Sequence, residues 1–406
     1  MSNLKLKISL FINYFLFAIL LNSVGTVILQ VQNTYHVAAS SAGTLEAFKD
    51  LSIAIMSFLV ASYLRKLGYK NAMLIALALV TVACLAMPSI NTFWMTKVLF
   101  ATVGISFALI KVSVYATLGI VTKDKSEHIS LMNFIESFFM IGILTGYFLF
   151  SGFVDDKNPS SNAWLNVYYL LAGMATIAFV LLLSTTIQTT SENSSSTNHS
   201  TQGFEAMFQL ALKPAVLIFI ASAFIYVLIE QSIMSWLPTF NSKVLHLPTT
   251  LSIQMASILA ASTALGRFIA GIVLRKAPWL LVLSTCIICS GLLVVVALPL
   301  ASTNQTNIIH GWADAPLVAF IFPLIGFLIA PIYPAINSLI LSTLPSEKHG
   351  MMSGLIVVFS ALGGTTGSFI TGHIFDSFGG QIAFYFSLIP MVALLICLFF
   401  FKKLNN

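Results

Sequence analysis

The sequence predicts an all-α membrane protein with twelve transmembrane helices in two six-helix halves. Three observations support this: 58% of the 406 residues are hydrophobic, only 8% are charged, and long apolar runs recur along the whole chain. About a quarter of the residues of a soluble globular protein are charged, so this composition excludes a soluble chain. A helix of about 20 apolar residues crosses a bilayer, and the runs have that length. We therefore expect a multi-pass integral membrane protein.

The apolar runs place the twelve spans along the chain. The first run is too long for the core of a signal peptide, so we interpret it as a retained first helix. The predicted spans are residues 8–31, 41–63, 71–91, 94–121, 129–153, 163–184, 214–238, 249–274, 278–300, 315–342, 350–375 and 381–401. Tryptophans near span ends are typical membrane-interface anchors, a role we assign to Trp94, Trp164 and Trp279.

A polar segment separates the first six spans from the last six. Thr185–Gly203 reads TTIQTTSENSSSTNHSTQG, and its Ser, Thr and Asn content cannot bury a core. We expect a flexible cytoplasmic linker there. The predicted domains are an N-terminal six-helix half at residues 1–184, a linker at 185–212 and a C-terminal six-helix half at 213–406.

Lys and Arg are distributed unevenly between the two sides of the membrane. With the amino terminus inside, the opposite side receives only Lys97, Lys157 and Lys243. Cytoplasmic loops carry an excess of Lys and Arg, so both termini are predicted to be cytoplasmic, in the inner (plasma) membrane of a bacterium. The net charge of +6 is not concentrated in a basic helix or patch, so we expect a monomer in the lipid bilayer and no nucleic-acid partner. The predicted cytoplasmic side carries Lys5, Lys7, Arg65, Lys66, Lys70, Lys123, Lys125, Lys213, Arg275, Lys276, Lys348, Lys402 and Lys403.

The two predicted halves resemble each other in sequence. Spans five and eleven align at an offset of about 221 residues, and the Arg65-Lys66 turn recurs as Arg275-Lys276. Parallel repeats of this kind hold a substrate site between the halves near the bilayer midplane. The glycine pairs are small-xxx-small motifs, which we interpret as packing sites, and the prolines of span ten predict kinks. The matched pairs include Gly142 with Gly363, Gly146 with Gly367 and Asp155 with Asp376, and the prolines are Pro323, Pro331 and Pro334.

Span two carries three charged residues at helix spacing. Glu46, Lys49 and Asp50 lie at i, i+3 and i+4, so they share one helix face. Each charge costs roughly 2.5–3.5 kcal/mol near a bilayer centre, so this face must look into protein or a water-filled cavity. Such a face is what a solute carrier needs. In the alternative interpretation, Lys49 only pairs with one of the acids and holds two helices together.

Further charged residues lie inside other predicted spans. Lys111, Glu136 and Glu230 lie in spans four, five and seven. Arg267 lies in span eight, about two turns from its basic end, so it could snorkel to the surface, and we favour a structural role for it. Without Arg267 the set contains four acids and two bases. Full ionisation would leave two uncompensated negative charges, so we expect at least one carboxyl to be protonated at rest and to exchange a proton.

These residues define the candidate site. Amides and aromatic rings beside the charges suit a small polar solute with an apolar face, such as a sugar. The candidates for proton coupling are Glu46, Asp50, Glu136 and Glu230. The candidates for substrate binding are Lys49, Lys111, Asn133, Tyr226, Gln231, Trp236, Tyr333 and Asn337. The expected partners are a small-molecule substrate and protons.

At several motifs the chain resembles the fucose–galactose–glucose proton symporter branch of the major facilitator superfamily. The motifs are Ala42-Gly43 through Lys70, Tyr226-Val227 to Glu230 with Ser235-Trp236, Gly266-Arg267-Phe268, Tyr333-Pro334 and the glycine-rich run from Gly363 to Gly372. This resemblance implies the twelve-helix fold of that superfamily and proton-coupled uptake of a sugar by alternating access. It extends over most of the chain.

The chain departs from this branch at two acidic positions. The branch has an Asn-Asp pair in its first helix where this chain has Gly25-Thr26, and a Glu in its fourth where this chain has Ile110-Lys111-Val112-Ser113. Either the acid has moved or the substrate has changed. A lysine facing the cavity favours a carboxylate-bearing or zwitterionic solute over a neutral sugar.

Other classes of protein remain to be weighed. An exporter of a drug or metabolite shares the fold, and the direction of transport cannot be read from the sequence. An enzyme is not expected, because the histidines are scattered, no cluster has metal-ligand spacing, and no nucleophile elbow or phosphate loop occurs. We expect neither a metal nor a cofactor. A sensor would need a sizeable cytoplasmic domain, and the longest polar stretch is the linker.

Overall fold

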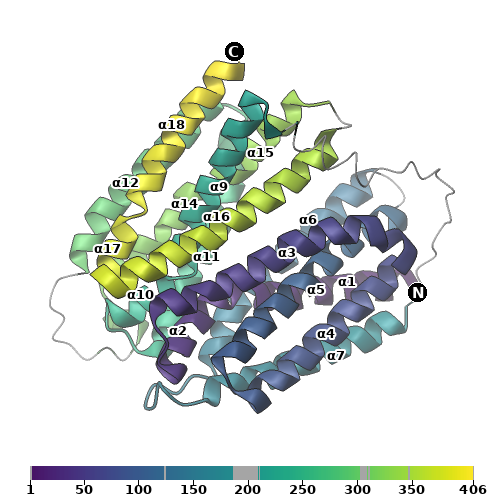
Figure 1. Ribbon diagram of the computed structural model, residues 1–406, viewed down its shortest axis with the longest axis horizontal. Coiled ribbons are helices and arrows are strands. Elements are labelled where there is room, and N and C mark those ends of the chain that lie inside the picture. The colour runs from purple at the N-terminus through teal and green to yellow at the C-terminus, as the bar shows by residue number, and fades with distance from the viewer. Residues whose placement is uncertain are drawn as a thin grey trace. The chain divides into compact units, whose positions relative to one another are not determined.

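The computed structural model describes residues 2–122, 125–185, 209, 211–301, 309, 311–345 and 348–405, and within them all regular structure is helical (Figure 1). Most of the predicted linker at 185–212 lies outside these residues. The helices before it are α1 (Ser2–Asn22), α2 (Val24–Tyr35), α3 (Ala39–Leu67), α4 (Tyr69–Ile90), α5 (Phe93–Val121), α6 (Lys125–Ser151), the short 3₁₀ helix η1 (Ala163–Asn166) and α7 (Val167–Leu183).

The helices after the linker are shorter and more often interrupted. They are α9 (Pro214–Met234), α10 (Leu237–Lys243), α11 (Thr249–Val273), α12 (Trp279–Leu300), η2 (Trp312–Asp314), α13 (Leu317–Ile321), η3 (Phe322–Leu324), α14 (Ile325–Ile329), α15 (Ile332–Thr343), α16 (His349–Phe378), α17 (Gly380–Tyr385) and α18 (Leu388–Asn405).

The predicted fold class is confirmed. In the described part of the chain, 11 helical stretches are long and apolar enough to cross a membrane, and each coincides with a predicted span. The remaining span, at 41–63, is the 29-residue helix α3, which carries Glu46, Lys49 and Asp50 and does not belong to that apolar set. The protein is therefore a multi-pass integral membrane protein.

The helices form two compact units, which we describe separately. The first unit contains the residues up to Val24, Phe48–Phe153 and the segment from Asn162 through α7. The second contains Gly25–Ala47, Val154–Ser161 and the helices from α9 to α18. Two segments that precede the linker thus pack with the helices that follow it. The division into halves at the linker stays a prediction.

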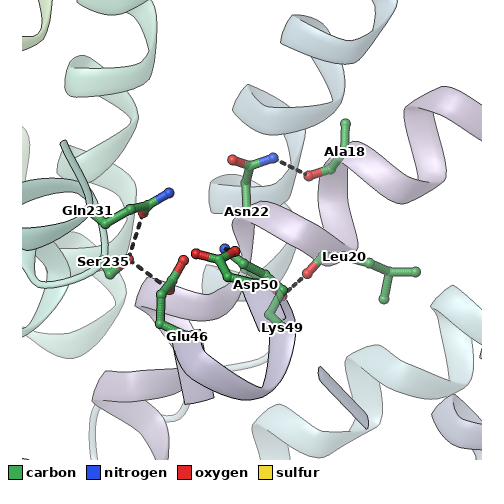
Figure 2. A network of polar contacts seen from close by, with 9 residues as sticks. Ala18, Leu20, Asn22, Glu46, Lys49, Asp50, Gln231 and Ser235 are labelled. Atoms are coloured by element: carbon green, nitrogen blue, oxygen red, sulfur yellow. Dashed lines mark hydrogen bonds and ion pairs between the residues drawn. The ribbon is translucent and has the colours of Figure 1, made fainter. Parts of the chain in front are cut away.

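Three predicted spans are each broken into two helices, at 8–31, at 214–238 and at 381–401, where α17 and α18 are separate helices. The run at 8–31 breaks at Ser23, whose hydroxyl donates to the Leu20 carbonyl at 2.7 Å, while Asn22 donates to the Ala18 carbonyl at 2.9 Å (Figure 2). The run at 214–238 breaks between α9 and α10, because Pro238 has no N–H for the Met234 carbonyl. Hydropathy does not report such breaks, since both sides of each break are apolar.

Prolines interrupt span ten as predicted. Pro323 lies in the 3₁₀ turn η3, and Pro331 separates α14 from α15, while Pro334 is accommodated inside α15. One interface assignment is wrong: Trp164 is 1% exposed, packs against Tyr168 and belongs to the core of the first unit, whereas Trp94 is 64% exposed.

The predicted glycine packing is confirmed. A Cβ added to Gly142 of α6 would lie 2.7 Å from the Ala18 Cβ of α1, whereas one on Gly146 would make an ordinary contact of 3.6 Å with Ile19. In α16, a Cβ on Gly363 or on Gly367 would collide with the backbone of α9. The repeat-related helices α6 and α16 therefore pack closely on α1 and α9, respectively (Figure 1).

Candidate functional site

In the first unit, a tyrosine, a glutamate and a lysine come together. Tyr115 of α5 donates a hydrogen bond to Glu136 of α6, with 2.6 Å between Oη and Oε1. Lys111 lies one helical turn before Tyr115 on the same face of α5, and the charge of Glu136 acts on its ammonium at longer range than a direct ion pair. The Lys111 side chain is exposed, with Nζ 5.8 Å from the centre of the Phe107 ring. Since an ammonium facing lipid at this depth is costly, we infer that Lys111 faces water.

Aromatic rings line the same region. Tyr14 of α1 is buried, and its ring centre lies 6.1 Å from Tyr115, 6.3 Å from Phe107 and 5.5 Å from Phe139. The rings come from α1, α5 and α6, the helices that also position Lys111 and Glu136. A charged pair against ring faces is suited to a small solute with one charged group and an apolar surface.

The charged face of α3 is buried in part within this unit. Lys49 and Asp50 are 6% and 9% exposed, and 3.4 Å separates Nζ from Oδ1. The α3 backbone at Lys49 packs directly on Gly104 of α5, where any side chain would collide with the Lys49 carbonyl. Gly104 lies seven residues, or about two turns, before Lys111 on the same helix face. The pairing of Lys49 with an acid agrees with the structural alternative for this residue.

In the second unit, a tyrosine, a glutamate and an arginine come together. Tyr226 donates to Glu230 one turn later on α9, with 2.9 Å between Oη and Oε1. Arg267 of α11 lies 3.6 Å from the same oxygen. The sequence left snorkelling open for Arg267 and favoured a structural role, and its side chain extends to a carboxylate of the neighbouring helix, as a structural role requires. A guanidinium stays protonated in proteins, so Glu230 has a permanent counter-charge.

A stacked tyrosine pair adjoins this ion pair. The rings of Tyr226 and Tyr333 are 5.4 Å apart and inclined by 22°, and the Tyr333 hydroxyl lies 2.8 Å from Ser360 Oγ. Asn337 lies one turn after Tyr333 on α15, and its buried Oδ1 has no hydrogen-bond partner among the described residues. A buried acceptor without a partner is costly, which is consistent with a site that awaits a polar group or water.

Glu46 lies in the second unit, where it contacts Ser235 in the break between α9 and α10. Glu46 is fully buried, and Ser235 Oγ lies 3.0 Å from its Oε2 and 3.1 Å from Oε1 of Gln231 (Figure 2). Trp236, beside Ser235, is fully buried and donates its indole N–H to Ser368 of α16 at 3.1 Å. The breakpoint thus gathers polar groups where the helix backbone is interrupted, as binding sites in transporters do.

The structure groups most of the predicted site residues and adds partners that were not predicted. Lys111 joins Glu136, Lys49 joins Asp50, and Tyr226, Glu230 and Tyr333 adjoin one another. The Asn133 side chain lies outside the described residues. Sequence reasoning missed Tyr115 and Ser360, and it named Ser235 only as part of the Ser235-Trp236 motif. The spacing of Tyr115 four residues after Lys111 is a signal that could have identified it. Ser360 has no comparable signal.

Fold and site together define a class of protein: a multi-pass membrane transporter with charged groups at membrane depth in both units. The family model of the Major Facilitator Superfamily matches residues 10–364, and the chain belongs to this superfamily. A search of curated proteins finds no match. Among the described residues, no group of three or more His, Cys, Asp or Glu side chains is placed to hold a metal ion. Its membership of this superfamily makes the protein a transporter.

Several solved structures share the fold. The nucleoside transporter NupG is 16% identical, with a TM-score of 0.74 and 99% of each chain covered. A D-xylose–proton symporter is 12% identical, with a TM-score of 0.71, 98% of this chain covered and 97% of the other. The transporter FucP in its outward conformation is 15% identical, with a TM-score of 0.61 and 99% of each chain covered. At this identity the similarity shows a shared fold. The predicted resemblance to the fucose symporter branch is therefore confirmed for the fold.

Proposed function

We propose that the protein is a proton-coupled symporter that takes up a small carboxylate-bearing or zwitterionic solute by alternating access. The observation that carries this proposal is the grouping of Lys111, Tyr115 and Glu136 in the first unit. The site offers a cation for the carboxylate of the solute and a carboxyl for the proton. The described residues around it provide ring faces for the rest of a small molecule.

Coupling follows from competition for Lys111. In this proposal, the ammonium of Lys111 serves as the counter-charge of Glu136 in the absence of solute. When a solute carboxylate engages Lys111, Glu136 loses its counter-charge, and its protonated form becomes favoured. Conversely, protonation of Glu136 releases Lys111 for the solute. By linkage each ligand then raises the affinity for the other, which makes a symporter load both or neither.

Glu136 suits the role of proton carrier better than Glu230. Arg267 cannot release its proton or move with a solute, so protonation of Glu230 would strand a guanidinium in the membrane. The side chain of Lys111, by contrast, is exposed, so a solute carboxylate can pair with its ammonium when Glu136 is neutral. Glu230 and the stacked tyrosines then form a fixed polar cluster of the second unit, in which Asn337 has an acceptor oxygen that is free among the described residues.

Alternating access requires contacts that close one end of the site and can break. Asp376 at the end of α16 accepts the backbone N–H groups of Ala39 and Ser40 at the start of α3, at 2.8 and 2.7 Å. Asp156, after α6, accepts the N–H of Thr250 at the start of α11 at 2.8 Å. Each carboxylate caps a helix N-terminus, where the unpaired N–H groups and the helix dipole favour a negative charge.

These two caps are related by the internal repeat. Asp376 aligns with Asp155, the neighbour of Asp156, and Ser40 precedes Thr250 by the same 210 residues that separate Arg65 from Arg275. Both capped starts lie at the predicted extracytoplasmic end, and both caps join a residue before the linker to one after it. We assign them to the closure of that end, and we expect them to break when the site opens outward.

The test begins with the identification of a ligand. The purified protein is screened by thermal shift against monocarboxylates, amino acids, sugars and nucleosides, since a ligand that binds the folded state raises its melting temperature. The proposal predicts that carboxylate-bearing compounds stabilise the protein and that neutral isosteres do not. Stabilisation by neutral sugars alone would reject the assigned solute class.

The second step measures the driving force in proteoliposomes. One proton moving with one monoanion carries no net charge, so uptake of a monoanion responds to the pH gradient alone. One proton moving with a zwitterion carries one positive charge, so its uptake responds to the membrane potential as well. Each unit of pH difference corresponds to about 1.4 kcal/mol and supports roughly tenfold accumulation. Accumulation driven by a sodium gradient at uniform pH would contradict proton coupling.

A further inference from the structure

A groove runs along the outer side of α15, away from the polar site. Its volume is about 570 Å³, and it is lined by α11, by the turn before α12 and by α15. The lining is mostly apolar and includes Leu274, Trp279, Pro331, Pro334 and Leu339. This volume lies within the range of sites that bind small molecules.

The groove exists because of the break before α15. Pro331 interrupts the helix, and beyond it α15 packs on α9, whereas α14, before the break, packs against both α11 and α12. Tyr333 extends from α15 toward Tyr226 and Ser360. Pro331 and Ala335 lie two residues away from Tyr333 on either side, which places them on roughly the opposite face of the helix. The groove is therefore separate from the tyrosine site.

Arg267 lies in the groove wall on α11, about two turns before the basic end of that helix. Its guanidinium is paired with Glu230, and it marks the inner end of the groove. Phe268 and Ile272, on the same stretch of α11, are 69% and 51% exposed. Exposed apolar side chains on a membrane-spanning helix are suited to contact lipid, and we infer that the groove on this part of α11 opens toward the bilayer.

The rim of the groove is basic. Arg275 and Lys276 are exposed and lie between the lining residues Leu274 and Ala277. Trp279 packs edge-on against Phe401, with ring centres 6.1 Å apart, and Phe401 is followed directly by two exposed lysines. Four exposed cations are therefore next in sequence to residues at or beside the groove mouth: Arg275 and Lys276 follow Leu274, and Lys402 and Lys403 follow Phe401.

No described acid compensates this rim. The described acids from residue 209 onward are Glu230, which is paired with Arg267, and Asp314 and Asp376. Asp314 precedes α13, at the end of the helices opposite to Arg275, and Asp376 caps the start of α3. The mouth thus has an excess of positive charge next to an apolar channel that opens to lipid.

We propose that this groove binds an anionic phospholipid of the leaflet at the basic end, the cytoplasmic leaflet in the predicted orientation. The phosphate would pair with the four rim cations, and an acyl chain would lie in the apolar groove toward Arg267. Basic pockets between transmembrane helices on the cytoplasmic side are suited to anionic headgroups, and Trp279 would lie at the headgroup level. The site is independent of the transported solute.

The test compares phosphatidylglycerol with phosphatidylcholine of the same chain length, each in nanodiscs that contain the full-length protein. We expect phosphatidylglycerol to raise the melting temperature and to be retained in native mass spectra, and phosphatidylcholine to do neither. Inorganic phosphate and free oleate are the control ligands. Equal effects of the two phospholipids, or the full effect from phosphate alone, would overturn the proposal.

Two variants separate the rim from the groove. Arg275→Ala/Lys276→Ala should weaken phosphatidylglycerol binding roughly fivefold per removed cation, whereas the charge-matched Lys5→Ala/Lys157→Ala should not. Gly271 lines the groove, and a Cβ added at this position meets no neighbouring atom, so Gly271→Leu should fill the groove without a clash. Gly173→Leu on α7 is its control, since a Cβ added there also meets no neighbouring atom. Gly271→Leu should displace the lipid with the rim intact. Unchanged binding in Gly271→Leu would show attraction by surface charge alone and reject the site.

Discussion

Each unit contains a glutamate inside a membrane-spanning helix, and the cation near that glutamate differs between the two units. In the first, Tyr115 donates to Glu136 at 2.6 Å and the nearby cation is Lys111. In the second, Tyr226 donates to Glu230 at 2.9 Å and the cation is Arg267 at 3.6 Å. Both carboxylates thus have a phenol donor and a positive neighbour. The difference lies in how firmly the cation is held.

This difference distinguishes a glutamate that can exchange a proton from one that forms a fixed structural ion pair. Arginine has a planar, always charged group that suits a fixed carboxylate partner, whereas lysine is a flexible point charge that changes partners readily. The pair in the second unit is therefore suited to hold α9 and α11 together. The pair in the first unit is suited to exchange one anion for another, which is the step that coupling requires. The predictions below test that division.

The largest expected effect concerns Glu136. Glu136→Gln removes the exchangeable proton, so accumulation driven by a pH gradient of one unit should fall from roughly tenfold to none. Counterflow exchange should persist, because the site still binds solute at Lys111. Uptake and counterflow of the ligand from the thermal-shift screen are measured in the same proteoliposomes.

Glu230→Gln is the matched control, since both residues are glutamates that accept a hydrogen bond from a tyrosine hydroxyl. It should retain accumulation by the pH gradient even where its affinity or expression is lower. Loss of accumulation in Glu230→Gln and its retention in Glu136→Gln would reverse the assignment.

The second effect concerns the two cations. Arg267→Gln leaves Glu230 without its ion partner and should lower the free energy of unfolding by about 1–2 kcal/mol, a figure reduced from that of a fully buried pair because Arg267 is 37% exposed. Lys111→Met should leave the melting temperature nearly unchanged and abolish binding of the anionic solute. Thermal unfolding and ligand titration distinguish the two variants. A strongly lowered melting temperature of Lys111→Met with intact affinity would make Lys111 structural.

The third effect compares glycines at matching places in the repeat. Gly367→Ala drives a methyl group into the backbone of α9 and should destabilise by about 1–3 kcal/mol. Gly146→Ala meets Ile19 at 3.6 Å and should be neutral or slightly stabilising, because alanine is the better helix former. Melting temperatures of the two variants in one detergent decide this. Equal costs would mean that α6 and α16 pack equally tightly.

The smallest effect concerns the caps. Asp376→Asn keeps one acceptor oxygen but loses the charge that faces two N–H groups, at a cost of about 1 kcal/mol. Asp156→Asn affects a single N–H and should cost less. Labelling of a cysteine placed at Ser40 from the extracytoplasmic side should rise more in Asp376→Asn than in Asp156→Asn. Equal labelling in both variants and the parent would show that the caps do not close that end.

The helices were predictable from the sequence because a membrane-spanning helix requires a long apolar run and because Lys and Arg are unevenly distributed between the loops on the two sides. The sequence did not predict the breaks at Ser23 and between α9 and α10, since these depend on one hydroxyl and on the missing N–H of Pro238. The glycine pairs were predictable as packing sites because a small residue at every fourth position has one main use in a membrane helix.

The sequence predicted which residues form the candidate site, but only some of the contacts between them. Tyr226 and Glu230 share a helix face, so their pairing is readable from the spacing. Tyr115 and Glu136 come from different helices, and no local pattern joins them. Arg267 could be read as a snorkelling side chain because its distance along α11 to the basic end is known from the sequence, whereas its distance to α9 is not.

The most direct measurement of the central claim is the affinity for the anionic ligand as a function of pH. If Glu136 carries the coupled proton, a lower proton concentration should weaken binding of the anion at Lys111, so the dissociation constant of the parent protein should rise with pH by up to tenfold per pH unit. In Glu136→Gln the dissociation constant should be independent of pH, with Lys111 always available. A pH-independent affinity in the parent, or the same slope in both proteins, would contradict coupling through Glu136 and Lys111.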